Sequence, residues 1–262
     1  MKTITIGTLK GGTGKTATLF NLAGLLAENY RVLLIDCDPQ TNLSLNCGVD
    51  ITVNNLNTII DIFEGNVSSD NVIFKNPIKE LKNIDIIPSN IKLTATELQI
   101  VSKAGRENIL RNFIASNKRA MGEYDYILID TNPSMGIINQ NAFLAADSII
   151  LVSDVSLNGI QGAELFTELW SNARKNLNMA NNIKALILNN LDKRIKLSAE
   201  LIEYCNDNEI TKDIILNTVI PSSVQIKNTE IEHKTINCLY KNSHIHEAYK
   251  KILVELKERG VV

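Results

Sequence analysis

The chain has 262 residues, of which 44% are hydrophobic, and its formal net charge is −2 at pH 7. This length suits one large α/β domain or two small ones. The near-neutral charge gives no sign of nucleic-acid binding, so any DNA contact would need a local basic patch. No stretch reaches the roughly 18 apolar residues of a membrane span, and the N-terminus runs directly into a motif instead of forming a secretory signal, so we expect a cytoplasmic protein.

Short apolar segments alternate with helical patterns along the chain, which is typical of βαβ units around a parallel sheet. Strands are predicted at residues 3–8, 32–36, 84–88, 126–130, 149–153, 183–189 and 214–218. Two segments, 32–35 and 126–129, are apolar at every position, as expected for parallel strands that are covered on both faces.

Helices are predicted between the strands, at residues 14–29, 56–64, 89–101, 107–116, 140–146, 159–176, 199–206 and 244–259. The chain shows no internal repeat and no linker-like segment, so residues 1–262 are expected to form a single domain. Because the first strand begins near residue 3, we expect no separate N-terminal DNA-binding domain. The predicted fold class is α/β, with a doubly wound, mostly parallel sheet and helices on both faces.

A glycine-rich loop stands between the first predicted strand and the first predicted helix, with the sequence Lys10-Gly11-Gly12-Thr13-Gly14-Lys15-Thr16. Glycines let backbone N–H groups point at phosphate oxygens, and the N-terminus of the following helix favours anions. Lys15 is expected to reach the β- and γ-phosphates, and the Thr16 hydroxyl to bind Mg²⁺. The loop differs from the standard pattern, because Leu9 replaces its first glycine and Lys10 adds a second lysine.

Aspartates follow the two strands that are apolar throughout. Asp36 and Asp38 come at the end of one strand, where Pro39 turns the chain, and Asp130 comes at the end of the other. The carboxyl edge of a parallel sheet is where open α/β folds bind ligands. Four apolar residues followed by Asp130 form a Walker B pattern, in which the carboxylate holds Mg²⁺.

These motifs resemble the deviant Walker A loop and the acidic strand ends of the ParA/MinD family of ATPases, and the DxDPQ string is closer to the ParA branch. The resemblance runs from about residue 3 to residue 256. It implies ATP and Mg²⁺ as cofactors and slow, partner-stimulated hydrolysis of ATP. It also implies that Lys10 reaches the nucleotide of the other subunit in an ATP-bound homodimer, that Asp38 orients the attacking water and that Asp36 lies near Mg²⁺. One departure is Asn132, which replaces a proline of the family.

Two later segments resemble the adenine site of the family. Asn189, at a strand end, is expected to hydrogen-bond the base, and the loop at Pro221 to pack on it, although each is equally compatible with an ordinary strand end or turn. The expected catalytic residues are Lys10, Lys15 and Asp38; the expected nucleotide-binding residues are Lys10, Gly11, Gly12, Thr13, Gly14, Lys15, Thr16, Ala17, Asn189 and Pro221; and the expected metal-binding residues are Thr16, Asp36 and Asp130.

Basic residues near the second adenine segment are the expected DNA contacts. The family often carries arginines there, at positions where this chain has Ser222 and Gln225. The remaining candidates are Lys193, Arg194, Lys196 and Lys227, each of which is almost as compatible with a solvated helix face. A lysine at a phosphate strengthens binding at low salt whatever the base sequence. The basic amphipathic stretch 244–259 lacks Trp and Phe, so we expect it to pack on its own sheet and not on a membrane.

The leading function hypothesis is an ATP-dependent dimerising ATPase for plasmid or chromosome partitioning. Its ATP-bound homodimer would hold non-specific DNA on the nucleoid, without stable membrane association, until a centromere-binding partner of the ParB type stimulates hydrolysis. The alternative is a MinD-like membrane-associated positioning ATPase, which would require lipid binding by residues 244–262. A metal-cluster reductase of the nitrogenase-iron-protein kind is disfavoured, because the four cysteines contain no suitable pair.

Overall fold

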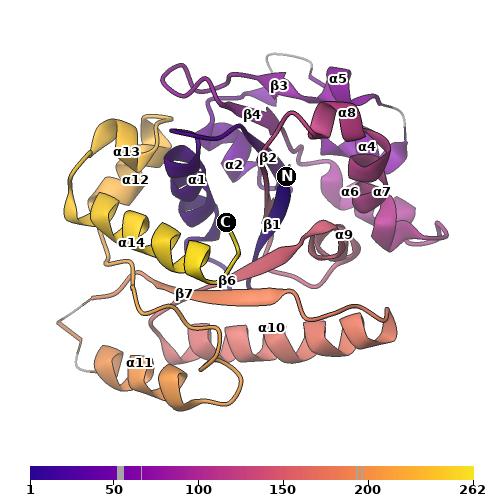
Figure 1. Cartoon of the computed structure of the whole chain (residues 1–262). Coiled ribbons are helices and arrows are strands. Elements are labelled where there is room, and N and C mark those ends of the chain that lie inside the picture. The colour runs from indigo at the N-terminus through magenta and orange to yellow at the C-terminus, as the bar shows by residue number, and fades with distance from the viewer. Residues whose placement is uncertain (52–55, 66, 193, 196) are drawn as a thin grey trace.

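The computed structural model describes residues 1–51, 56–65, 67–192, 194–195 and 197–262. Its centre is a seven-stranded sheet in the order β3-β4-β2-β5-β1-β6-β7, in which β3 runs antiparallel to β4 and the other neighbours are parallel (Figure 1). The strands are β1 (Lys2–Gly7), β2 (Val32–Cys37), β3 (Phe74–Lys75), β4 (Ile84–Ile87), β5 (Tyr126–Thr131), β6 (Ser148–Asp154) and β7 (Ile183–Asn189). The predicted α/β fold class is confirmed.

Helices enclose this sheet on both faces. They are α1 (Lys15–Leu26), α2 (Asn42–Asn46), α4 (Ile59–Glu64), α5 (Ser69–Val72), α6 (Leu93–Ile100), a 3₁₀ turn (Arg106–Asn108), α7 (Ile109–Ser116), α8 (Lys118–Met121), α9 (Ile137–Ala145), α10 (Leu157–Asn176), α11 (Leu197–Asp207), α12 (Val224–Ile231), α13 (Ile236–Leu239) and α14 (His244–Glu258). Figure 1 shows α1, α12, α13 and α14 on one side of the sheet and α4, α6, α7 and α9 on the other. Short elements such as β3, α2 and α13 were not predicted, because they are too short to show a period.

Strands β2 and β5 form the centre of the sheet and position the site. Leu33, Leu34 and Ile35 are completely buried, because the sheet is covered on both faces. The two strands pair in parallel register, and Asp36 lies opposite Asp130 at their carboxyl ends. The two acidic strand ends are therefore direct neighbours at one edge of the sheet.

The predicted strand at residues 214–218 is wrong. This segment forms only an isolated bridge to β7, between Leu186 and Ile215. The reason lies in α14: the Glu255 carboxylate accepts hydrogen bonds from the backbone N–H groups of Asn217 and Thr218. In addition, the Arg259 guanidinium donates to the backbone carbonyl oxygens of Ile215, in the same segment, and of Asp213, just before it. Side chains thus satisfy backbone groups that a strand would have paired with a neighbouring strand.

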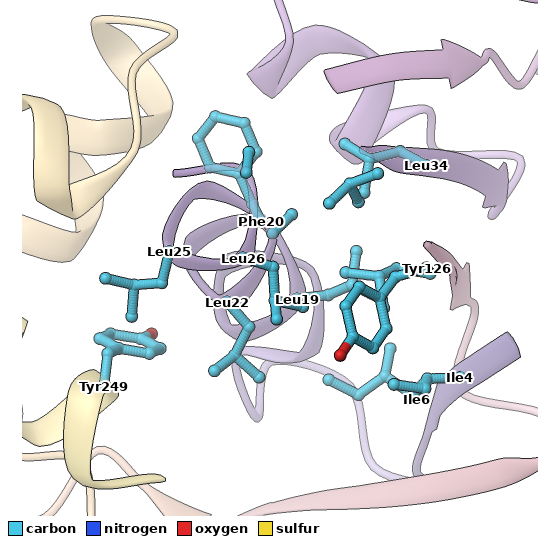
Figure 2. Packing of buried hydrophobic residues seen from close by; sticks show 14 of the residues in the cluster. Ile4, Ile6, Leu19, Phe20, Leu22, Leu25, Leu26, Leu34, Tyr126 and Tyr249 are labelled. Atoms are coloured by element: carbon cyan, nitrogen blue, oxygen red, sulfur yellow. The ribbon is translucent and has the colours of Figure 1, made fainter. Parts of the chain in front are cut away.

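Helix α14 packs its apolar face into the core, as the sequence predicted. Tyr249, Ile252 and Leu256 are completely buried, and Figure 2 shows Tyr249 beside Leu22 and Leu25 of α1. The face that a membrane-bound helix would offer to lipid is therefore occupied inside the protein. Among the residues that the structure describes, no helix combines the length and the apolar character that a membrane crossing requires.

Replacing Ile252 by Ala should lower the free energy of unfolding by about 3 kcal/mol, because it removes a buried side chain and leaves a cavity. The matched control is Val254→Ala in the same helix, where the residue is 55% exposed and the expected loss is below about 0.5 kcal/mol. Urea denaturation of both variants measures the difference. Equal losses would contradict the docking of α14.

Candidate functional site

The loop between β1 and α1 has the backbone that its glycines allow. Gly12 and Gly14 have φ angles of 76° and 84°, in the left-handed region that residues with a Cβ rarely adopt. Gly14 precedes α1, and no side chain caps this helix, so its first N–H groups are left to a ligand. Residues 11–17 line one side of an open pocket of about 750 Å³.

Lys15 brings a cation into this pocket although the residue is only 7% exposed. Burial lowers the pKa of its ammonium group, and the nearby charges of Asp130 and Asp38 offset part of that effect. A largely desolvated ammonium group favours an anionic ligand, which replaces the lost solvation. The placement of Lys15 therefore suits its predicted role in binding phosphate.

Thr16 and Asp130 meet at the predicted metal position. The Thr16 hydroxyl donates a hydrogen bond of 2.7 Å to Oδ2 of Asp130, whereas Oδ1 of Asp130 is buried with no partner among the described residues. Burial raises the pKa of Asp130 to about 6, although the Thr16 hydrogen bond and the charge of Lys15 lower it. A hydroxyl and a carboxylate with an unused oxygen are the hard ligands that Mg²⁺ prefers. The residues present therefore fit Mg²⁺.

Asp36, the third predicted metal residue, is engaged inside the protein. Its Oδ1 accepts a hydrogen bond of 3.0 Å from the N–H of Asp38. Its Oδ2 accepts from both the N–H and the hydroxyl of Ser44, at 2.9 and 2.7 Å. Burial, and secondly the neighbouring Asp130, raises the pKa of Asp36 to about 7. Asp36 thus holds the loop that carries Asp38. The carboxylate oxygen left without a partner among the described residues is Oδ1 of Asp130, beside Thr16.

Asp38 lines the pocket and is 6% exposed. Its Oδ1 accepts a hydrogen bond of 2.8 Å from the N–H of Gln40, and its own N–H is held by Asp36. The carboxylate is therefore fixed through both its side chain and its backbone. This geometry suits the role in orienting water that the resemblance implies.

The loop after Asp130 is closed by hydrogen bonds where the family has a proline. Oδ1 of Asn132 accepts from the Ser134 hydroxyl at 2.6 Å and from the Asn139 amide at 2.8 Å. Asn139, in α9, also donates to the backbone carbonyl oxygens of Asn132 and Ser134. The substitution therefore replaces a rigid ring by a hydrogen-bonded turn and leaves Asp130 at its strand end.

Lys10 is held outside the pocket that Lys15 lines. Its ammonium group lies 2.7 and 2.9 Å from the two carboxylate oxygens of Asp154, at the end of β6. It also donates to the Ser156 hydroxyl over 3.0 Å. Within the described part of the chain, Lys15 lines the pocket and Lys10 does not. The two lysines of the loop therefore have different surroundings.

The two predicted adenine segments both reach the pocket. Asn189 lines it, and its amide nitrogen donates to the carbonyl oxygen of Thr13 over 2.8 Å, while Oδ1 has no partner among the described residues. That free acceptor suits the amino group of a base. Pro221 forms a bridge with Leu191 beside the pocket, and the residues that line it are its neighbours Ser222 and Ser223.

Of the four DNA candidates, the structure describes Arg194 and Lys227. Lys193 and Lys196 lie outside the described residues. Arg194 is exposed and forms an ion pair of 2.6 Å with Asp192, so a local carboxylate already partners its charge. Lys227, in α12, lines the nucleotide pocket.

Sequence reasoning missed several polar residues around the site, among them Ser44, Asn46, Asp154 and Glu230. Asp154 carried a usable signal, because it follows an apolar strand in the same way as Asp36 and Asp130. The others lie in or beside the short helices α2 and α12, whose patterns gave no signal.

Comparison with known proteins identifies the family of this chain. Residues 1–185 match the family model described as an AAA domain. The chain is 31% identical over 260 residues to the sporulation initiation inhibitor protein Soj of Bacillus subtilis, with 99% of each chain covered. The chain belongs to the ParA/Soj family of ATPases. It is also similar to the chromosome partitioning protein ParA of Caulobacter vibrioides, with 29% identity over 99% of this chain and 95% of that protein.

Solved structures of related proteins have the same fold as this chain. A putative plasmid partition protein from Borrelia burgdorferi bound to AMPPNP has a TM-score of 0.79 and 26% identity, covering 98% of this chain and 99% of that one. McdA of Cyanothece has a TM-score of 0.86 at 23% identity, covering 98% and 99%, and shows the shared fold. The chain is thus a partitioning-type ATPase with ATP and Mg²⁺ as cofactors, in agreement with the loop and the Thr16–Asp130 pair.

The raised pKa of Asp130 predicts a dependence on pH. The folded protein holds this proton more tightly than the unfolded chain, so the group stabilises the ligand-free fold below pH 4 and that contribution is lost as the pH rises through about 6. Asp130→Asn should therefore stabilise the ligand-free protein by on the order of 3 kcal/mol at pH 8, with little effect near pH 4.

Thermal melting from pH 4 to pH 8 measures this effect, with the exposed Asp207→Asn as control. Added Mg²⁺ and ATP should raise the melting temperature of the wild-type protein more at pH 8 than at pH 5, because Mg²⁺ binds the charged carboxylate. A stabilisation by Asp130→Asn that is the same at pH 4 and pH 8 would contradict the account.

Proposed function

We propose that this protein is an ATP-switched dimer that partitions plasmid or chromosomal DNA. Residues 1–262 act as one ATPase domain, two subunits close around two ATP molecules, and the closed dimer holds non-specific DNA on the nucleoid. A centromere-binding partner of the ParB type then stimulates slow hydrolysis, which opens the dimer. Membership of the ParA/Soj family and the geometry of the pocket support this proposal.

The observation that carries the dimer is the position of Lys10. A loop lysine that worked on the nucleotide of its own subunit would line the same pocket as Lys15, but Lys10 is held by Asp154 and Ser156. The Lys10 and Asp154 side chains are 33% and 20% exposed. An ion pair of this kind adds only about 1 kcal/mol to the free energy of unfolding. A triphosphate on another subunit carries several negative charges, so it competes well with the single carboxylate of Asp154 for the Lys10 ammonium group.

Each polar group of the pocket has a distinct task in the proposed reaction. The N–H groups of the loop and the Lys15 ammonium bind the phosphates, and Thr16 with Asp130 would hold Mg²⁺, which supplies positive charge against the phosphate oxygens. Asp38 accepts a hydrogen bond from the attacking water and orients it. Lys10 of the second subunit stabilises the charge that develops on the phosphates, which makes hydrolysis depend on the dimer.

DNA binding rests on lysines, because the usual arginine positions carry Ser222 and Gln225. Lys227 lines the nucleotide pocket, and Asp192 offsets part of the Arg194 charge through an exposed and weak ion pair. We therefore assign the main DNA contacts to Lys193 and Lys196, which follow β7 in the sequence, with Arg194 as a weaker contact. Phosphate contacts of this kind do not depend on base sequence and weaken steeply with salt.

The dimer is tested with a variant that retains ATP. Asp38→Ala should bind ATP but not hydrolyse it, so that ATP-bound dimers accumulate and light scattering reports twice the monomer mass. Adding Lys10→Ala to this background should weaken the dimer by about 100-fold or more, because each of two sites loses a charge-assisted hydrogen bond. A double variant that dimerises as tightly as Asp38→Ala would rule out Lys10 as the link between subunits.

The DNA contacts are tested with the ATP-loaded Asp38→Ala protein and a random-sequence duplex. Lys193→Glu with Lys196→Glu should weaken binding by about tenfold or more at low salt and reduce the salt dependence, because fewer counterions are released. Lys118→Glu with Arg119→Glu, in α8, is the charge-matched control and should have little effect. Equal losses in both pairs would place the DNA contacts elsewhere.

A further inference from the structure

A glutamate in α6 reaches the N-terminus of α9, a helix on the same side of the sheet (Figure 1). The residue before α9 is Gly136, which has no side chain that could cap the helix. Instead, the backbone N–H of Ile138 donates a hydrogen bond of 3.3 Å to Oε1 of Glu97, 41 residues earlier in the chain. A carboxylate at this end of a helix satisfies a free N–H group and complements the helix dipole. Glu97 therefore acts as an N-cap that another helix supplies.

The Glu97 carboxylate lies directly against the backbone of Gly136. A Cβ added to Gly136 would collide with Oε1 of Glu97. The φ and ψ angles of Gly136 are −63° and 170°, which any residue can adopt. A side chain at residue 136 would therefore fit the backbone and would have to displace the Glu97 carboxylate. A change at either residue should disturb the same contact.

A short loop joins this capped end of α9 to the nucleotide pocket. The loop follows Asp130, and Asn139 of α9 donates a hydrogen bond to the backbone carbonyl oxygen of Asn132, so the loop and the beginning of α9 are tied together. Between them, Pro133 lines the pocket, and a Cβ added to Gly11 would lie 3.9 Å from its Cγ. The position of α9 relative to α6 therefore sets the wall that Pro133 forms beside the phosphate loop.

The rest of α9 is held independently of Glu97. Oδ1 of Asn141 accepts a hydrogen bond of 3.1 Å from the N–H of Leu110, and the Thr5 hydroxyl donates to the carbonyl oxygen of Ala142 over 2.9 Å. Loss of the Glu97 carboxylate should therefore loosen the first turn of α9 and the loop before it, while the helix itself stays folded.

We propose that Glu97 is a positioning residue for ATP hydrolysis. By capping α9 from α6, its carboxylate holds the loop after Asp130 against the phosphate loop, so that the phosphates and the water oriented by Asp38 meet in a pocket of fixed shape. Residues 11–17 line that pocket, and Glu97 is not among the described residues that do so. Glu97 thus acts through the backbone of α9 and affects the rate of hydrolysis, not the affinity for the nucleotide. This inference rests on the proposed hydrolysis of ATP.

Steady-state hydrolysis of ATP and calorimetric titration with AMPPNP and Mg²⁺ test this role. Glu97→Ala should lower kcat about tenfold and leave the Kd for AMPPNP within about twofold of the wild type, because the loop loses its orientation while the phosphate contacts remain. Glu97→Gln keeps an oxygen that accepts from the Ile138 N–H and should recover most of kcat. Gly136→Ala displaces the carboxylate and should lower kcat as much as Glu97→Ala. The double variant should be no slower than either single variant, because both changes break one contact.

Two control variants separate positioning from stability. Ser243→Ala removes the side-chain N-cap of α14, so it should lower the melting temperature about as much as Glu97→Ala and leave kcat unchanged. Gln99→Ala changes an exposed neighbour of Glu97 in α6 and should alter neither kcat nor the melting temperature.

Three results would overturn the inference. If Glu97→Ala lowers kcat no more than Ser243→Ala does, or weakens AMPPNP binding as much as it lowers kcat, Glu97 does not position the loop for hydrolysis. Additive losses in the double variant would show that Glu97 and Gly136 act separately. A Glu97→Gln variant as slow as Glu97→Ala would contradict the capping hydrogen bond. A wild-type protein that binds AMPPNP but hydrolyses no ATP would overturn the proposed ATPase function itself, which is a different failure.

Discussion

The pairing of β2 with β5 is the constraint on which the site depends. Their register places Asp36 and Asp130 side by side at the edge of the sheet, and Lys15 and Asp38 complete a buried group of three carboxylates and one ammonium. Burial raises the pKa values of Asp36 and Asp130, because ionising both carboxyl groups would place excess negative charge in a desolvated place. A divalent cation relieves that excess, and it arrives together with a phosphate that Lys15 can neutralise.

A third carboxylate ends β6, which is separated from β5 by β1. Asp154 ends β6 as Asp130 ends β5, but it is paired with Lys10 instead of being left to a metal. The loop therefore holds two lysines in different states, one desolvated in the pocket and one paired at its margin. A lysine held beside the pocket by a weak ion pair can be transferred to a stronger anion without unfolding anything. This arrangement supports the proposal that a second subunit completes the catalytic site.

Some of this structure follows from local sequence and some does not. The strands β2 and β5, the glycine loop and Asp130 were predictable, because continuous apolar runs, positive-φ glycines and strand-end carboxylates are local signals. The partner of Lys10 was not, since it requires knowing that β1 lies beside β6. The sequence of residues 214–218 is typical of a strand, but Glu255 and Arg259, about 40 residues later, form hydrogen bonds with the backbone groups of this segment. The pocket-lining residues of α2 and α12 gave no signal because both helices are short.

The most direct test of the account is to mix two inactive variants. Lys10→Ala and Lys15→Ala subunits should each be inactive alone, but their mixed dimer contains one complete site, in which ATP on the Lys15-bearing subunit meets Lys10 of its neighbour. The account predicts that ATPase activity partly returns when the two are mixed, up to about one quarter of the wild-type rate for equal amounts that assemble randomly. If the mixture stays as inactive as its parts while both variants are folded, Lys10 does not act across the dimer, and the two-subunit site is wrong.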